Sequence, residues 1–317
     1  MLEQKTILVT GGAGFIGSHL CEELLAQGGN VICFDNFSQS SLDNVNFLSD
    51  NPSFTLIKGD CNKRADIEKV FQENKIDYVF HYAAVVGVKR TQENPLSVLE
   101  DIEGIKHIFR LSHEYKVKKV VFASSSEVYG EPIELPEKED GVLNAHIPYA
   151  HVKLIGEDYV KAYWEKYHLP TVSLRFFNVY GPRQESSDYG FVVGIFMRQV
   201  LEGKSPTVVG DGQMTRNFVY VKDNVQAAIT CLPTDQVNGE VLNIGTGDAT
   251  TILELAQKIV HIAGQDLKIT FIPPRNTHEI LHRQPDITKQ LEKLKYQPTF
   301  ELDEGLKVTY ESYKKSC

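Results

Sequence analysis

Short apolar runs alternate with longer amphipathic stretches over the first 177 residues of the chain. The apolar runs predict strands at residues 5–10, 31–35, 54–58, 78–81, 119–124 and 171–177. Apolar positions that recur every three or four residues predict helices between these strands, at residues 15–27, 63–73, 97–115 and 149–167. Strands that alternate with helices predict an α/β fold, a doubly wound parallel sheet covered by helices on both faces.

The rhythm changes after residue 177. Gly-Pro, Gly-Asp-Gly and Pro-Pro segments separate shorter elements there, and helical patterns cover residues 191–202, 251–263 and 303–313. We therefore expect a first domain over residues 1–177 and a smaller C-terminal α/β lobe over residues 178–317, with residues 241–244 returning to the first sheet. A cleft between two such lobes is a common place for a small ligand.

Composition narrows the classes of function. The 317 residues are 42% apolar and carry a net charge of −9, which argues against disorder and against nucleic-acid binding. The five cysteines are scattered without a CxxC pair, and the histidines form no zinc-binding motif, so we expect no metal and no disulfide framework. We also expect no signal peptide, no membrane span and a place in the reducing cytoplasm.

A glycine-rich segment follows the first predicted strand. Residues 11–17 read Gly-Gly-Ala-Gly-Phe-Ile-Gly and open a helix, so Gly11, Gly14 and Gly17 allow a tight turn whose backbone N–H groups face a pyrophosphate. Asp35 ends the second predicted strand, where a carboxylate binds an adenosine ribose and repels a 2′-phosphate. The pattern predicts a Rossmann-like dinucleotide site that binds NAD rather than NADP.

A tyrosine and a lysine supply candidate acid–base chemistry. Tyr149 and Lys153 lie four residues apart on a predicted helix and so share one face, while Ser125 follows the fifth predicted strand. A phenol with an ordinary pKa of about 10 is a weak base at neutral pH, but a nearby ammonium favours its ionised form. We expect Tyr149 to remove a hydroxyl proton while the attached carbon gives hydride to NAD, with Ser125 bonding the same oxygen.

With these features, the chain resembles the extended short-chain dehydrogenase/reductase family of NAD-dependent nucleotide-sugar epimerases, decarboxylases and dehydratases. The resemblance extends nearly end to end and lies in the segments TGGAGFIGSH (10–19), DNFS (35–38), GD (59–60), HYAA (81–84), SSSEVYG (124–130), YAHVK (149–153), RFFNVYGPRQ (175–184) and GDGQMTRNFVYV (210–221). Such a combination is specific for the family and much less specific for one of its members.

The resemblance implies two sets of site residues. A tightly held NAD is expected to contact Gly11, Gly14, Phe15, Ile16, Gly17, Asp35, Asn36, Ser38, Asp60, Cys61, Ala83, Ala84, Asp101, Ser124, Tyr149, Lys153 and Phe176. The nucleotide sugar, with uridine diphosphate as the implied nucleotide, is expected to contact Ser125, Ser126, Glu127, Asn178, Val193, Thr207, Val209, Arg216, Arg275 and Arg283. Planar guanidinium groups suit phosphate oxygens, which makes Arg216 and Arg275 the expected ligands of the diphosphate.

Two positions depart from the family's pattern. Val152 stands where relatives often have Ser or Thr, and Asp101 stands where many relatives have Asn near the nicotinamide ribose. These departures keep open a family member that binds NAD and a partner protein without catalysis. An alcohol dehydrogenase that exchanges free cofactor is a third interpretation, which the long substrate lobe disfavours.

The fate of a 4-keto sugar separates the family's reactions: epimerisation at C4, decarboxylation of a C6 carboxylate, or dehydration through loss of the C5 proton and the C6 hydroxyl. Glu127 lies in a Ser-Ser-Glu segment similar to those of decarboxylases and dehydratases, where the glutamate acts in proton transfer near C5. Residues 282–287 resemble a segment of UDP-glucuronate decarboxylases whose arginine, here Arg283, pairs with the sugar carboxylate. Residues 87–95 are similar to UDP-glucuronate 4-epimerases.

The second lobe favours epimerisation. Residues 176–184, 190–196 and 215–218 are more similar to bacterial UDP-hexose and UDP-N-acetylhexosamine 4-epimerases. We therefore predict an NAD-dependent 4-epimerase of a UDP-sugar, with UDP-glucuronate as one candidate substrate, and keep a UDP-glucuronate decarboxylase or nucleotide-sugar dehydratase as the alternative. The predicted helices 97–115 and 149–167 carry apolar residues on more than one face, and the resemblance implies that they form the interface of a homodimer.

Overall fold

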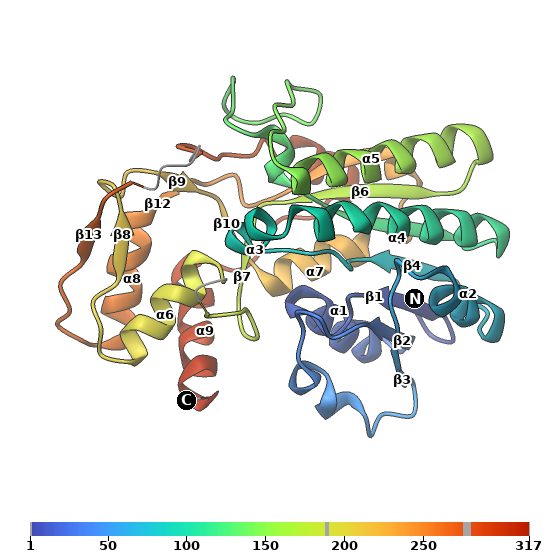
Figure 1. The fold of residues 1–317 in the computed structure, drawn as a ribbon, viewed down its shortest axis with the longest axis horizontal. Helices are drawn as coiled ribbons and strands as arrows, with labels where there is room; N and C mark the ends of the chain where they lie inside the picture. Colours follow the sequence, from blue (N-terminus) through green and yellow to red (C-terminus); the bar gives the residue numbers. More distant parts are fainter. Residues whose placement is uncertain (1, 188–189, 275–279, 317) are drawn as a thin grey trace.

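The computed structural model describes residues 2–187, 190–274 and 280–316, and a seven-stranded sheet lies at its centre (Figure 1). All neighbouring strands in it are parallel. Their order across the sheet is β11 (Glu240–Ile244), β6 (Thr171–Phe176), β5 (Lys119–Ser125), β4 (Tyr78–His81), β1 (Thr6–Thr10), β2 (Asn30–Asp35) and β3 (Phe54–Lys58). The α/β fold predicted from the sequence is confirmed, and the six strands predicted before residue 178 agree to within one residue.

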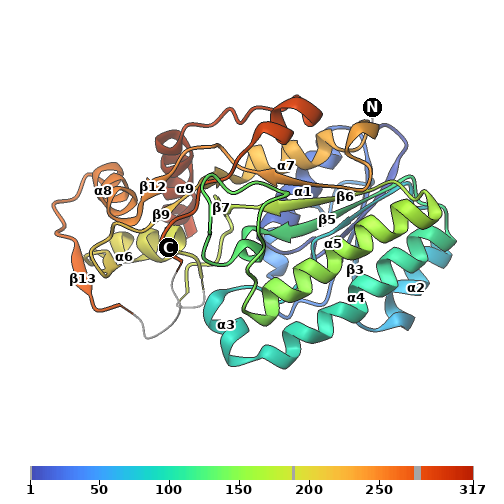
Figure 2. The same cartoon turned by 90° about the horizontal axis from the view of Figure 1, so that it is seen from above.

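Helices cover both faces of the sheet. Their bounds are α1 (Phe15–Ala26), α2 (Arg64–Glu73), α3 (Val88–Glu93), α4 (Pro95–Glu114), α5 (Pro148–Tyr167) and α7 (Val221–Thr230). Because successive side chains of a strand point to opposite faces, Ile7 and Val9 of β1 join the core with α1 and α7, whereas Leu8 joins the core with α2, α4 and α5. Figure 2 shows α4 and α5 side by side along the second of these faces.

A smaller lobe lies beyond one end of the sheet (Figure 1). It contains α6 (Val192–Leu201), α8 (Ile252–Ala263), α9 (Leu302–Ser316) and the paired strands β8 (Thr207–Val209) with β13 (Thr270–Ile272) and β9 (Thr215–Arg216) with β12 (Thr250–Thr251). Strands β7 (Asn178–Tyr180) and β10 (Phe218–Tyr220) pair with each other where the two lobes meet. Short helical turns occupy Leu42–Asn44, Asn46–Leu48, Ser126–Tyr129, Asp235–Val237 and Gln290–Leu294.

The chain passes back and forth between the lobes. α7 and β11 follow residue 178 in sequence, yet α7 packs on α1 and β11 pairs with β6. A single domain boundary at residue 177 therefore stays a prediction. None of the helices in the three described ranges is long and apolar enough to cross a membrane.

Candidate active site

A cavity of about 800 Å³ lies at the carboxyl-terminal ends of the strands and reaches the segment that follows β6. Every residue that the sequence predicts to bind NAD lines this cavity. They come from the ends of six strands and from the starts of α1, α4 and α5, so the topology brings together residues that are far apart in sequence. Their contact with NAD itself stays a prediction.

The glycine-rich loop lies tightly against the start of α1. Gly11 has a φ of +68°, a conformation that favours glycine, and a β-carbon at Gly17 would overlap the carbonyl oxygen of Gly11. Gly14 and Gly17 line the cavity with the first residues of α1, so the positive end of the helix dipole faces it. This close, side-chain-free approach fits the pyrophosphate of a dinucleotide.

Asp35 is fixed at the end of β2 beside this loop. Its side chain is nearly buried, and its two oxygens accept hydrogen bonds from the Ala13 N–H (3.0 Å), the Phe37 N–H (2.9 Å) and the Ser40 hydroxyl (2.7 Å). An ionised carboxylate held in this way suits ribose hydroxyls and repels a 2′-phosphate. The geometry thus fits NAD at the place that the sequence predicted.

Helix α5 brings Tyr149 and Lys153, the predicted acid–base pair, to the same cavity. Tyr149 lies in its first turn, one turn before Lys153, whose Nζ lies 5.4 Å from the centre of the tyrosine ring. The ammonium donates to the carbonyl oxygen of Ala123 at 2.7 Å and is almost fully buried. Ser125, at the end of β5, forms a hydrogen bond with Tyr149. The three residues predicted to act together therefore lie together.

Burial perturbs both titrating groups of this pair. It raises the pKa of Tyr149, which the Ser125 hydrogen bond opposes. It lowers the pKa of Lys153 to about 8, against the carboxylates of Asp101 and Glu157, which raise it. An ammonium whose pKa lies this close to neutrality keeps most of its charge at pH 7 and is easily lost at alkaline pH.

Asp101 lies on the wall of the cavity, on α4. One carboxylate oxygen accepts the Val85 N–H at 2.7 Å, and the other accepts the Asn62 side-chain amide at 3.4 Å. Burial raises the pKa of Asp101, while Lys153 and these hydrogen bonds lower it. The departure from the Asn of many relatives thus places a carboxyl group that interacts with Lys153 on the cavity wall.

A buried ion pair supports helix α5 and was missed in the sequence. Glu157 lies one turn beyond Lys153, and its carboxylate accepts from Arg175 of β6 at 2.9 Å and 2.7 Å. The Ser124 hydroxyl donates to the same carboxylate, and Arg175 also donates to the Tyr129 hydroxyl at 2.8 Å. The spacing of four that joins Tyr149 to Lys153 continues to Glu157, and this was the signal available in the sequence.

The cavity wall includes a second group that was missed. Arg90 of α3 donates to both carboxylate oxygens of Glu185 at 3.2 Å and to the Gln39 side-chain oxygen at 3.1 Å. All three residues line the cavity. They connect the loop after β2 with the segment after β7, which is where the two lobes meet.

The predicted substrate residues divide into two sets. Ser125, Ser126, Glu127 and Asn178 line the cavity. The others that the structure describes are outside its lining: Val193 is buried in the core, Thr207 bonds Gln199, Val209 lies at the end of β8, Arg216 donates to the carbonyl oxygen of Thr215, and Arg283 is buried. Arg275 lies outside the described residues.

Arg283 has protein partners at the place where a sugar carboxylate was expected. Its guanidinium is 1% exposed and lies 2.6 Å from the carboxylate of Glu137, while its second terminal nitrogen lies 3.4 Å from Glu127. Burial raises the pKa of Glu137, and Arg283 opposes this rise. Glu137 was not found from the sequence, because nothing local indicates that a loop residue meets an arginine 146 positions later.

Comparisons with known proteins agree with this site. The match to the NAD dependent epimerase/dehydratase family covers residues 7–245. The UDP-N-acetyl-alpha-D-glucosaminuronate decarboxylase of Bacillus cytotoxicus is 37% identical over 98% of each chain, and a putative UDP-glucose 4-epimerase of Methanocaldococcus jannaschii is 36% identical over 95% of this chain and 96% of its own.

The chain is also similar to a solved structure along nearly its whole length. The UDP-glucose 4-epimerase of Thermotoga maritima, crystallised with UDP-glucose, has a TM-score of 0.92 at 35% identity and covers 98% of this chain and 99% of its own. The chain thus combines the fold, the glycine-rich loop and the Ser125–Tyr149–Lys153 group with sequence similarity to these enzymes along nearly its whole length. The protein belongs to the NAD dependent epimerase/dehydratase family.

Proposed function

We propose that the protein is an NAD-dependent nucleotide-sugar 4-epimerase that acts on a UDP-linked sugar. The observation that carries this proposal is the meeting of Ser125, Tyr149 and Lys153 at the wall of one cavity with the glycine-rich loop and Asp35. The relatives named above include two 4-epimerases of UDP-glucose, one of them putative, which supports UDP as the nucleotide.

Bound NAD supplies the hydride acceptor and donor at C4 of the sugar. Tyr149 takes the proton of the C4 hydroxyl as general base and returns it when the alcohol forms again. Lys153 favours the ionised phenol through its positive charge, and Ser125 donates a hydrogen bond to the same sugar oxygen. Epimerisation then requires the 4-keto sugar to present its other face, so that hydride returns to C4 from the opposite side while Tyr149 returns the proton to the oxygen.

Proton NMR of the purified protein with UDP-glucose, UDP-N-acetylglucosamine and UDP-glucuronate tests the proposal. We expect at least one of them to reach an equilibrium mixture with its C4 epimer, without added cofactor if NAD is tightly held. Tyr149→Phe keeps the ring and removes the base, so its rate should fall at least about a hundredfold. Unchanged spectra in all three tubes would contradict the proposal.

Glu127 favours a second candidate, a nucleotide-sugar dehydratase or decarboxylase. Its backbone N–H donates to the Ser125 hydroxyl at 3.2 Å, and its carboxylate lines the cavity beside the catalytic group. A carboxylate there could remove the C5 proton of a 4-keto sugar. The same NMR experiment separates the reactions, since dehydration gives a 6-deoxy-4-keto product and decarboxylation a UDP-pentose, and Glu127→Gln would stop the dehydration.

We further propose that the protein is a homodimer formed through α4 and α5. Leu96, Leu99 and Tyr167 on these helices, with Tyr115 directly after α4, are between 41% and 75% exposed, more than apolar side chains of this size usually are. Light scattering during size-exclusion chromatography tests this, and a mass near 36 kDa would contradict it because the single chain has 35.7 kDa. We place the activity in the cytoplasm, where it would supply sugars for polysaccharide synthesis.

A further inference from the structure

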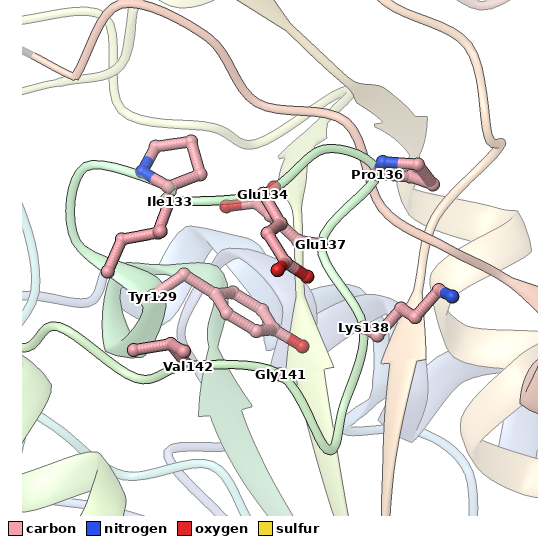
Figure 3. A pocket seen from close by; sticks show the side chains of 9 residues that line it. Tyr129, Ile133, Glu134, Pro136, Glu137, Lys138, Gly141 and Val142 are labelled. Atoms are coloured by element: carbon pink, nitrogen blue, oxygen red, sulfur yellow. The ribbon is translucent and has the colours of Figure 1, made fainter.

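Glu137 occupies a buried position behind the sugar end of the cavity. It lies in the loop between the turn Ser126–Tyr129 and α5, and its side chain is 1% exposed. Figure 3 shows the Glu137 side chain pointing inward toward the Tyr129 ring, whereas Lys138 points away. A carboxylate removed from water in this way needs a charged or hydrogen-bonding partner.

That partner is Arg283, and the backbone holds the two residues together. One terminal nitrogen of Arg283 lies 2.6 Å from Glu137, and the Gln284 N–H donates to the other carboxylate oxygen at 3.1 Å. The Glu137 N–H donates to the carbonyl oxygen of Gln284, and the Asp286 N–H donates to that of Glu137, each at 2.8 Å. Arg283 therefore cannot turn toward the cavity without giving up a buried ion pair.

Glu127 is the outward-facing member of this group. Its side chain is 35% exposed and lines the cavity, and its carboxylate lies 3.4 Å from the second terminal nitrogen of Arg283. One guanidinium thus serves two carboxylates, and the group as a whole has an excess of negative charge. The charge that reaches the cavity is that of Glu127.

Other cations of the cavity wall are engaged elsewhere. Among the described residues that line it, the lysines and arginines are Arg90, Lys153 and Arg183. Arg90 pairs with Glu185 and Arg183 with Glu22, while Lys153 lies beside the ring of Tyr149. A carboxylate on the sugar would therefore lie near the carboxylate of Glu127. Among the described residues of the cavity wall, each lysine and arginine already has another partner.

We propose that Glu137 is a positioning and specificity-determining residue, which holds Arg283 away from the substrate and thereby selects against a carboxylate at C5 of the sugar. This inference rests on the proposed function and narrows its substrate to UDP-linked sugars with a neutral C5 substituent, such as a hydroxymethyl group. Glu127 remains in place to accept a hydrogen bond from that group.

Calorimetric titration of the holoenzyme with UDP, UDP-glucose and UDP-glucuronate tests the selection independently of turnover. We expect UDP-glucose to bind at least about tenfold more tightly than UDP-glucuronate, because two like charges meet only in the second complex. Glu137→Gln removes one negative charge and should bring this ratio toward one. Glu134→Gln, an exposed position in the same loop, is the matched control and should leave the ratio unchanged.

Thermal melting shows whether Glu137→Gln folds. If it does not, Glu127→Gln decides, since it leaves the buried pair intact and removes the charge that faces the cavity, and the ratio should again fall. Wild-type protein that binds UDP-glucuronate as tightly as UDP-glucose, or a ratio unchanged in the folded variant, overturns the inference while UDP binding upholds the nucleotide site. Failure of UDP and both sugars to bind overturns the proposed function and this inference with it.

Discussion

Replacing Glu157 with alanine should destabilise the protein strongly, although the residue touches neither predicted ligand. Its carboxylate makes two charge-assisted hydrogen bonds to Arg175, at 2.9 Å and 2.7 Å, and the arginine is 2% exposed. Breaking a buried pair from one side leaves the other charge uncompensated, which costs about 3–5 kcal/mol. We therefore expect the free energy of unfolding of Glu157→Ala to fall by about this amount.

Unfolding in guanidinium chloride, followed by tryptophan fluorescence, measures this loss. The protein has a single tryptophan, Trp164, which lies on the same helix as Glu157 and so reports on the element in question. The control is Glu68→Ala, which breaks the surface pair with Arg64 on α2, where solvent screens the charges and we expect a much smaller loss than for Glu157→Ala. A loss of less than about 1 kcal/mol for Glu157→Ala would refute the reasoning from burial.

A double variant separates the ion pair from the shape of the site. Glu157→Leu combined with Arg175→Met removes both charges at once and fills much of the same space. Because no unpaired charge is left, most of the lost stability should return. If the double variant is as unstable as Glu157→Ala, the packing or the bonds to Ser124 and Tyr129, rather than the uncompensated charge, account for the loss.

Two further predictions concern the cofactor loop and the catalytic pair. In Gly17→Ala the new β-carbon would overlap the Gly11 carbonyl oxygen, so the loop must shift. The affinity of the apoprotein for NAD, measured by calorimetry, should therefore fall at least about tenfold. Unchanged affinity would show that the loop adapts to the added methyl group. Since the pKa of Lys153 is lowered to about 8, its ammonium is lost above that pH, so kcat should fall from about pH 8 upward. Lys153→Met should be slow throughout and lack this alkaline decline, and a wild-type rate that stays level to about pH 10 would contradict the assignment.

The sequence predicted those parts of the site that depend on local spacing. The glycine-rich loop, the carboxylate that ends β2 and the spacing of Tyr149 and Lys153 each lie within one element or one turn, so a short segment was enough to find them. Strand ends could be predicted in the same way, and parallel strands bring their ends to one edge. This is why Asp35 and Ser125 could be expected beside the cofactor loop from the order of strands and helices alone.

The parts that the sequence did not predict depend on distant pairings. Arg283 was noticed, but its partner Glu137 lies on a loop whose path is set by a backbone bridge to residues 284–286, and no periodicity reports that bridge. Helix α3 spans only six residues after Gly87, which is too short for an amphipathic pattern. Helix α7 begins directly after the three-residue strand β10, which concealed its start.

The late return of β11 to the sheet affects how the protein is made. Strand β6 leaves the ribosome well before β11, the outermost strand, which pairs with the free edge of β6. At a synthesis rate of about 5–20 residues per second, that edge stays unpaired for several seconds. An open strand edge recruits other chains, so the nascent protein is most prone to aggregate while the segment between β6 and β11 is translated. Slow translation through this segment should therefore lower the yield of folded protein.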